Sequence, residues 1–127
     1  MSTNLQLLLS RVLLSIIFIS SGFGKLGNVE GTAGYMANLG VPAPGLTVWL
    51  VIALEALGGL AILAGFFTRY AAWALAAFCV ASAFLAHYQP ADQMQMISFM
   101  KNLAIAGGFL ALASSGAGAW SVDARRR

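Results

Sequence analysis

Four long apolar runs occupy most of this chain and limit what it can fold into. They cover residues 5–24, 46–67, 70–88 and 97–116, and each approaches the roughly 20 residues that a helix needs to span a bilayer. Charged residues make up only 9% of the sequence, whereas soluble domains contain about 25%. The sequence therefore predicts an all-α membrane protein with a single domain over residues 1–127, folded as a bundle of four transmembrane helices.

The connections between these runs differ in length. Residues 26–45, which are rich in glycine, separate the first two runs, and a connection this long is commonly functional or partly structured. Apolar residues at helical spacing between Val29 and Leu39 predict either a short helix at the membrane surface or a structured loop that caps the bundle. We expect the first run to be retained, because Arg11 interrupts it and no basic residue precedes it, unlike in a cleaved signal.

The basic residues indicate how the helices are oriented. Lys and Arg collect on the cytoplasmic side of membrane proteins, and residues 125–127 are all arginine. With an even number of spans, both termini lie on that side together with Arg69, while Glu30 and Asp92 lie outside. The formal net charge of +3 is thus explained by topology. The expected partner is the lipid bilayer, and no nucleic-acid partner is expected.

Glu55 lies in the middle of the second apolar run. A charge near the centre of a bilayer costs roughly 2.5–3.5 kcal/mol on insertion scales, so it normally faces protein or water and has a partner. From the rise of a helix, Glu55 and Arg11 lie at depths that a long arginine side chain could bridge. Such a pair would form the charged floor of a cavity that opens outward, or would simply fix the helix register.

Other polar residues are expected nearer the outer end of the bundle. Lys25 is typical of an interfacial anchor. Lys101 is an anchor or, together with Asn102, a contact for a polar head group. His87 is a hydrogen-bonded helix end or a proton carrier. With Arg11 and Glu55, these side chains form a predicted polar seam that either binds a ligand or holds the helices together.

Glycines and the single cysteine are predicted to serve packing. Small residues let transmembrane helices approach closely, and this role is expected at Gly22, Gly58, Gly59, Gly65, Gly107 and Gly108. Cys79 is expected to be a buried packing residue, and a single cysteine cannot form an internal disulfide. No metal site is expected, because no Cys or carboxylate lies at metal-site spacing from the single histidine.

Four motifs occur in order over nearly the whole chain. They are RVLLSIIFISSGFGKL from Arg11, LGVPAP from Leu39, EALGGLAILAGFFTR from Glu55 and KNLAIAGG from Lys101. Together they resemble the DoxX family of small four-helix bacterial membrane proteins. The resemblance implies an inner-membrane protein associated with redox chemistry, because the family takes its name from membrane subunits linked to quinone and sulfur chemistry.

A quinone is the cofactor that the resemblance implies. Arg11 and Glu55 would form its polar floor, and Lys101, Asn102 and His87 would contact its head group. Electrons would pass through the quinone or a redox protein partner, because the chain offers no dithiol or histidine pair. It is therefore not expected to be a complete enzyme alone. Two alternatives stay open, namely a non-catalytic scaffold that recruits a partner or forms a homo-oligomer, and a small oligomeric transporter.

Overall fold

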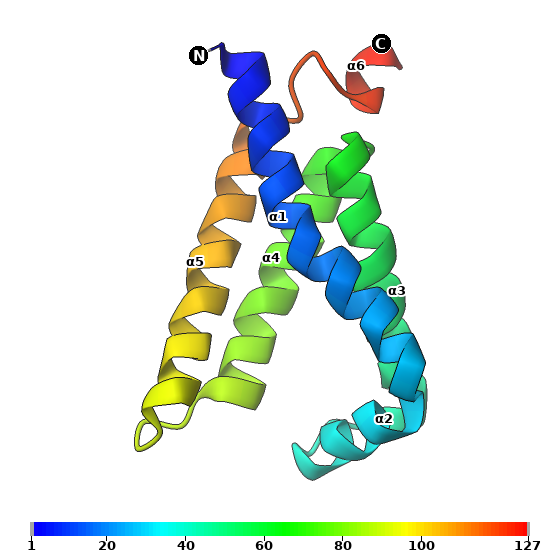
Figure 1. Cartoon of the computed structure of the whole chain (residues 1–127), viewed down its shortest axis with the longest axis vertical. Coiled ribbons are helices and arrows are strands. Elements are labelled where there is room, and N and C mark those ends of the chain that lie inside the picture. Colours follow the sequence, from blue (N-terminus) through cyan, green and yellow to red (C-terminus); the bar gives the residue numbers. More distant parts are fainter. Residues whose placement is uncertain (1, 127) are drawn as a thin grey trace.

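The computed structural model describes residues 2–126, and four of its helices are long and apolar enough to cross a membrane. These are α1 (Thr3–Lys25), α3 (Pro44–Ala64), α4 (Thr68–Ser82), which continues into the π-helical turn η2 (Ala83–His87), and α5 (Gln93–Ser115). The predicted all-α, four-helix membrane fold is confirmed (Figure 1).

Two helix boundaries differ from the hydropathy pattern for local reasons. Helix α3 ends at Ala64, three residues early, because Gly65 has a left-handed φ of 71° that L-residues rarely adopt. Helix α5 starts at Gln93, four residues early, because the side chain of Asp92 accepts hydrogen bonds from the backbone N–H groups of Met94 and Gln95. Hydropathy does not detect such a polar first turn.

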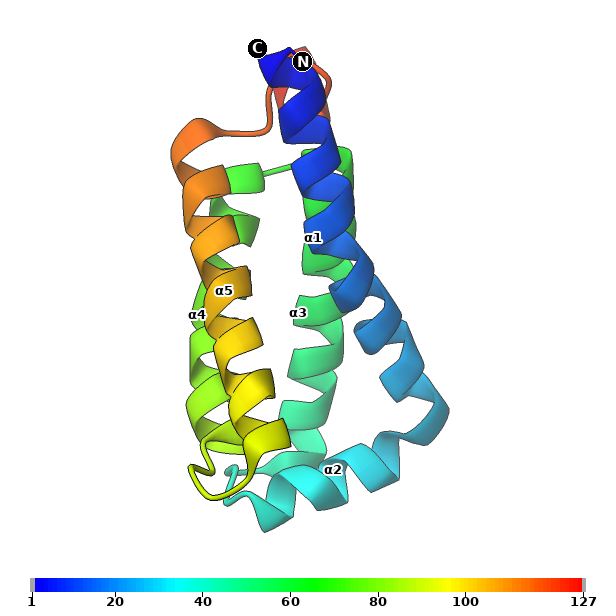
Figure 2. The same ribbon diagram turned by 60° about the vertical axis from the view of Figure 1, so that its left-hand side comes forward.

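The helices form two pairs. Helices α1 and α3 pack along each other, as do α4 and α5, and the two pairs diverge toward the end away from the termini (Figures 1 and 2). Glycines permit the close approach of α1 and α3. A Cβ at Gly22 would lie 2.6 Å from the backbone nitrogen of Ala56, and one at Gly59 would lie 2.9 Å from Cγ1 of Ile19.

The other glycines predicted to serve packing occupy different settings. A Cβ at Gly58 would meet Leu75 at 3.4 Å, and one at Gly108 would meet Leu14 at 3.3 Å. A Cβ at Gly65 would collide with the guanidinium of Arg11. Gly107 differs from the rest, because no described atom beyond its neighbours and the adjacent backbone of its own helix lies within 4 Å of its Cβ position. The prediction of a packing contact at Gly107 is therefore corrected for the described part of the chain.

A short helix crosses the wide end of the bundle. The chain leaves α1 through the 3₁₀ turn η1 (Leu26–Asn28) and forms α2 (Val29–Asn38). The side chain of Asn28 caps α2 by accepting from the N–H of Gly31, and Gly40, with φ 81°, follows the helix end. Figure 2 shows α2 running beneath the ends of the helix pairs. The predicted partly structured connection is thus a helix that covers this end.

The tightly packed core lies nearer the termini. Phe18 of α1 meets Phe109 of α5 edge-to-face, with ring centroids 5.4 Å apart, and Ile62 and Leu75 are fully buried beside them. Cys79 is also buried. After α5, the chain turns back to form α6 (Val122–Arg125) over the turn between α3 and α4. Both termini therefore lie at the same end of the bundle (Figure 1).

Candidate functional site

A cavity of about 410 Å³ lies between the diverging helices at the end that α2 covers. Its lining includes four of the six residues of the predicted polar seam, namely Lys25, Glu55, His87 and Asn102. Most of the remaining wall is apolar and comes from all four long helices. The larger apolar side chains from these helices and η2 include Ile17, Phe18, Val51, Phe78, Leu85 and Ile105.

Glu55 forms an ion pair with Lys25 in the wall of this cavity. The Nζ of Lys25 lies 2.6 Å from Oε1 of Glu55 and also donates a hydrogen bond of 2.6 Å to Oγ of Ser21. Glu55 is only 4% exposed, and the side chain of Lys25 is 24% exposed. The sequence left Lys25 between an interfacial anchor and a member of the polar seam, and the structure places its ammonium beside the buried carboxylate.

The predicted pairing of Glu55 with Arg11 is corrected for a geometric reason. Side chains on a helix lean toward its N-terminus. The N-terminus of α1 lies at the end with both chain termini (Figure 1), so the side chain of Arg11 extends toward that end and away from Glu55. The same lean directs Lys25 from the last turn of α1 back toward Ser21 and Glu55.

Arg11 belongs to a different cluster. Its side chain is 1% exposed, and its Nη2 donates a 2.7 Å hydrogen bond to the backbone oxygen of Trp120. The guanidinium contacts Gly65 at the end of α3. Arg11 therefore holds the C-terminal segment against α1 and α3, and it does not line the 410 Å³ cavity.

The outer seam residues are only partly brought together. Nδ2 of Asn102 donates to Oγ of Ser82 over 3.1 Å. Nδ1 of His87 lies 2.7 Å from Oε1 of Gln95, and His87 is carried by the π-helical turn η2, a kind of turn often found at functional sites. Lys101 is exposed and does not line the cavity.

Sequence reasoning missed several polar residues of the site. Ser21 could have been found, because it lies four residues before Lys25 and therefore on the same face of the helix. Thr32 and Tyr35 of α2 also line the cavity. The spacing between Val29 and Leu39 predicted a surface helix or a capping loop, but it did not indicate that Thr32 and Tyr35 line the cavity. Among residues 2–126, no group of three His, Cys, Asp or Glu side chains could hold a metal ion.

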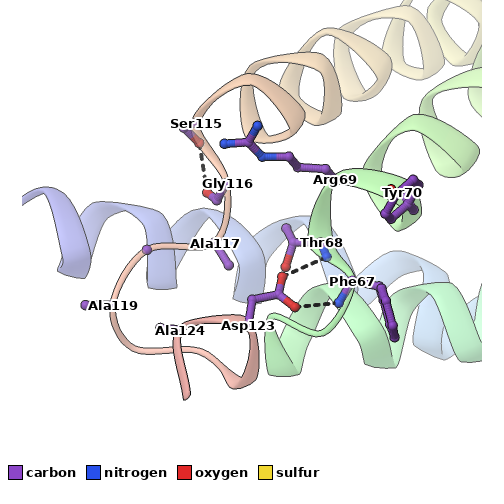
Figure 3. A pocket seen from close by; sticks show the side chains of 11 residues that line it. Phe67, Thr68, Arg69, Tyr70, Ser115, Gly116, Ala117, Ala119, Asp123 and Ala124 are labelled. Carbon is purple, nitrogen blue, oxygen red and sulfur yellow. Dashed lines mark hydrogen bonds between the residues drawn. The ribbon is translucent and has the colours of Figure 1, made fainter. Parts of the chain in front are cut away.

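A second cavity, of about 510 Å³, lies at the opposite end of the bundle (Figure 3). Its wall includes Asp123 of α6, whose carboxylate accepts from the backbone N–H groups of Phe67, at 2.7 Å, and Thr68, at 2.9 Å. Burial acts to raise the pKa of Asp123, but hydrogen bonds from the backbone and the side chain of Thr68, the backbone hydrogen bond from Phe67 and the charge of Arg126 outweigh it and lower the pKa below its usual value. Asp123 is therefore an ionised cap on the first turn of α4.

Comparison with known proteins places this chain among bacterial membrane proteins. It is 49% identical over 120 residues to the inner membrane protein YqjF of Escherichia coli (strain K12), covering 94% of this chain and 91% of that protein. It is 39% identical over 124 residues to the inner membrane protein YphA of the same organism, covering 94% of this chain and 89% of that protein.

A more distant match is the putative oxidoreductase CatD of Bacillus subtilis (strain 168), which is 32% identical over 68 residues, or 54% of this chain and 49% of that protein. No solved structure matches the chain significantly. The family model of DoxX matches residues 6–88. With that match and two relatives that align over nearly their whole length, this chain belongs to the DoxX family of membrane proteins.

Proposed function

We propose that this protein binds a lipid-soluble molecule of the quinone class in the 410 Å³ cavity. The observation that carries the proposal is the buried Lys25–Glu55 pair, which lies in the wall of a mainly apolar cavity. Ligand sites typically have this character, with volumes of about 300–1,000 Å³, apolar walls and a few convergent polar groups.

The free hydrogen-bonding capacity of the pair fits such a head group. An ammonium group has three donors, and Lys25 uses two of them on Ser21 and Glu55. The third is available to a quinone carbonyl. Oε2 of Glu55 makes no hydrogen bond to the described residues and can accept from the hydroxyl of the reduced form. Half-exposed Ile17 and Leu85 would contact the apolar tail where it leaves the cavity.

In this proposal the chain acts as a membrane subunit associated with redox chemistry. The quinone would exchange electrons with a partner redox protein, because Cys79 is a single cysteine and His87 a single histidine. The similarity to CatD, which is named a putative oxidoreductase, supports the redox association. The competing function is a scaffold, in which the ion pair would only hold α1 against α3.

We further propose that both termini face the cytoplasm. Arg69, Arg125 and Arg126 lie at the end of the bundle that carries the termini, whereas Glu30 and Asp92 lie toward the other end. Basic residues accumulate on the cytoplasmic side. The quinone-class cavity would then lie in the outer half of the membrane.

Titration with a short-tailed quinone tests the proposed function. A ligand that binds only the folded state raises the midpoint of thermal unfolding in proportion to its occupancy. We expect a saturable rise for the parent protein in detergent. Ala81 lines the cavity, so Ala81→Phe should fill it and abolish the rise.

Ala74→Phe is the matched control for this experiment. Ala74 lies on α4 two turns from Ala81, is exposed and lines none of the cavities described above. This variant should respond to the quinone like the parent. An equal rise in all three proteins would indicate non-specific partitioning and would contradict the proposal. No rise in any of them would favour the scaffold.

A further inference from the structure

The second cavity, beside the termini, has no part in the proposed quinone-class function. It lies between the start of α4, the end of α5 and α6, at the opposite end of the bundle from Glu55 (Figure 3). Its volume of about 510 Å³ is ample for a small head group. Its chemistry therefore needs a separate explanation.

Arg69 is the cation of this cavity. Its guanidinium extends along the end of α5, with Nη2 3.5 Å from the position that a Cβ on Gly116 would occupy. The ion pairs within residues 2–126 are Lys25–Glu55 and Arg126–Asp123, so no described carboxylate pairs with Arg69. The planar guanidinium has five donors suited to a bidentate contact with an oxyanion.

The carboxylate in the same cavity does not neutralise Arg69. Both oxygens of Asp123 already accept from the N–H groups of Phe67 and Thr68, and its counterion is Arg126. Asp123 therefore serves the first turn of α4 and leaves Arg69 available to a ligand.

Buried polar atoms without a partner lie beside this cation. Thr68 lines the cavity and is 1% exposed, and its side chain interacts with the carboxylate of Asp123. Nε and Nη1 of the buried Arg11 lack a described partner, and Arg11 and the cavity residue Ala117 both lie beside Gly65. Buried polar groups are normally satisfied, and here the unmet groups include donors.

The charge and the surface of this end define the kind of ligand. Arg11, Arg69, Arg125 and Arg126 stand against a single carboxylate, Asp123, among the described residues of this end. Exposed aromatic side chains also surround the cavity. Phe67 and Tyr70 line it, and the exposed Trp120 follows the lining residue Ala119. Aromatic side chains gather at the level of lipid head groups, where phosphate is the abundant anion.

We propose that this cavity binds a phosphate group, that of a membrane phospholipid, with Arg69 as its main ligand. Basic pockets between transmembrane helices are known to accept anionic head groups. Arginine also marks membrane topology, but a topology signal does not require the side chain to line a cavity. The proposal does not depend on the quinone-class function.

Native mass spectrometry with added phosphatidylglycerol tests this site. Arg69→Gln removes the main ligand, whereas Arg125→Gln makes the same charge change at the same end outside the cavity lining. We expect the parent and Arg125→Gln to retain one phosphatidylglycerol. Arg69→Gln should bind it at least about tenfold more weakly, because hydrogen bonds to charged groups contribute about 1.5–3 kcal/mol. Arg69→Lys should fold like the parent and bind with intermediate affinity, because it keeps the charge and loses the planar fork.

Two further arms separate the possible sources of the phosphate. Diacylglycerol, which has the acyl chains without phosphate, should not be retained. Inorganic phosphate alone should not displace the lipid. Equal retention of phosphatidylglycerol by Arg69→Gln and Arg125→Gln would overturn the proposal, and so would retention of diacylglycerol. Displacement of the lipid by inorganic phosphate would overturn the lipid assignment and indicate a site for the free anion.

Discussion

Among single residues, Lys25 and Glu55 determine the chemistry of the cavity. Glu55 is held below the membrane surface, and the side chain of Lys25 runs back along the last turn of α1 to meet it. Buried ion pairs contribute little net stability, whereas removing one partner leaves an uncompensated charge. The pair is therefore costly to break and easy to replace as a unit.

A comparison of single and double variants tests this statement. We expect Lys25→Met to lower the free energy of unfolding by about 3 kcal/mol, because it leaves the carboxylate of Glu55 buried without a cation. The double variant Lys25→Met/Glu55→Leu should recover most of this loss and still bind no quinone. The measurement is unfolding in mixed detergent micelles. A double variant as unstable as the single one would show that the pair is needed for the fold.

Gly22 supports a second prediction, for the contact between α1 and α3. A Cβ there would lie 2.6 Å from the backbone nitrogen of Ala56, so Gly22→Ala should force the helices apart and cost about 1–3 kcal/mol. Gly107→Ala is the matched control, because a Cβ there would meet no described atom beyond the adjacent part of its own helix. Equal unfolding free energies for the two variants would refute the close approach of α1 and α3.

The need of Glu55 for a cationic partner could be predicted from its sequence position, but the hypothesis that this partner is Arg11 is contradicted by the ion pair with Lys25. Depth along each helix favoured Arg11. The lean of side chains toward the helix N-terminus favours Lys25, and the bond from Lys25 to Ser21 follows that lean. Sequence gives the depth of a residue more readily than the direction of a long side chain.

At the scale of the elements, the C-terminal segment, residues 117–126, ties together the end of the bundle beside the termini, and we call it the C-terminal clasp. Asp123 of α6 caps α4 through Phe67 and Thr68, and its own N–H donates to the backbone oxygen of Gly65. Arg11 of α1 holds the same segment through Trp120. The segment thereby joins α1 to the turn between α3 and α4. Hydropathy could not predict this clasp, because residues 117–126 lie outside the apolar runs.

The clasp should depend on pH through Asp123. The pKa of Asp123 in the folded protein is lower than its usual value of 3.8, so the ionised carboxylate stabilises the folded state. This stabilisation is fully present above pH 3.8 and is lost as the pH falls through the lowered pKa. At pH 7, Asp123→Asn should speed amide exchange at Phe67 and Thr68 by about tenfold, since hydrogen bonds to a charged acceptor are stronger.

The amide exchange rates of the parent and of Asp123→Asn at Phe67 and Thr68 should become equal once the pH falls below the lowered pKa of Asp123. Asp92→Asn is the control, because Asp92 caps α5 at the other end of the bundle and should leave exchange at Phe67 and Thr68 unchanged. A difference between the parent and Asp123→Asn that persists under acidic conditions would rule out the carboxylate as its source.

At the scale of the whole molecule, the two helix pairs pack near the termini and diverge beneath α2. The number of spans could be predicted from the sequence, because each apolar run is by itself long enough to cross a bilayer as a helix. The pairing and divergence could not, since they arise from contacts between distant residues such as Gly22 and Ala56. The cavity lies where the pairs separate.

Reporter fusions test the proposed orientation of the molecule. A fluorescent protein fused to the C-terminus should be bright in the bacterium, and alkaline phosphatase at that position should be inactive. Alkaline phosphatase inserted between Tyr88 and Asp92, in the turn between η2 and α5, should be active. The reverse pattern would place the termini outside.

The central claim is that the cavity holds a quinone-class molecule in the native membrane. The most direct measurement is mass spectrometry of an organic extract of the protein purified from that membrane, with Ala81→Phe and Ala74→Phe prepared in parallel. The account predicts a near-stoichiometric isoprenoid quinone in the parent and in Ala74→Phe, and only bulk lipid in Ala81→Phe. Bulk lipid alone in all three proteins would contradict it.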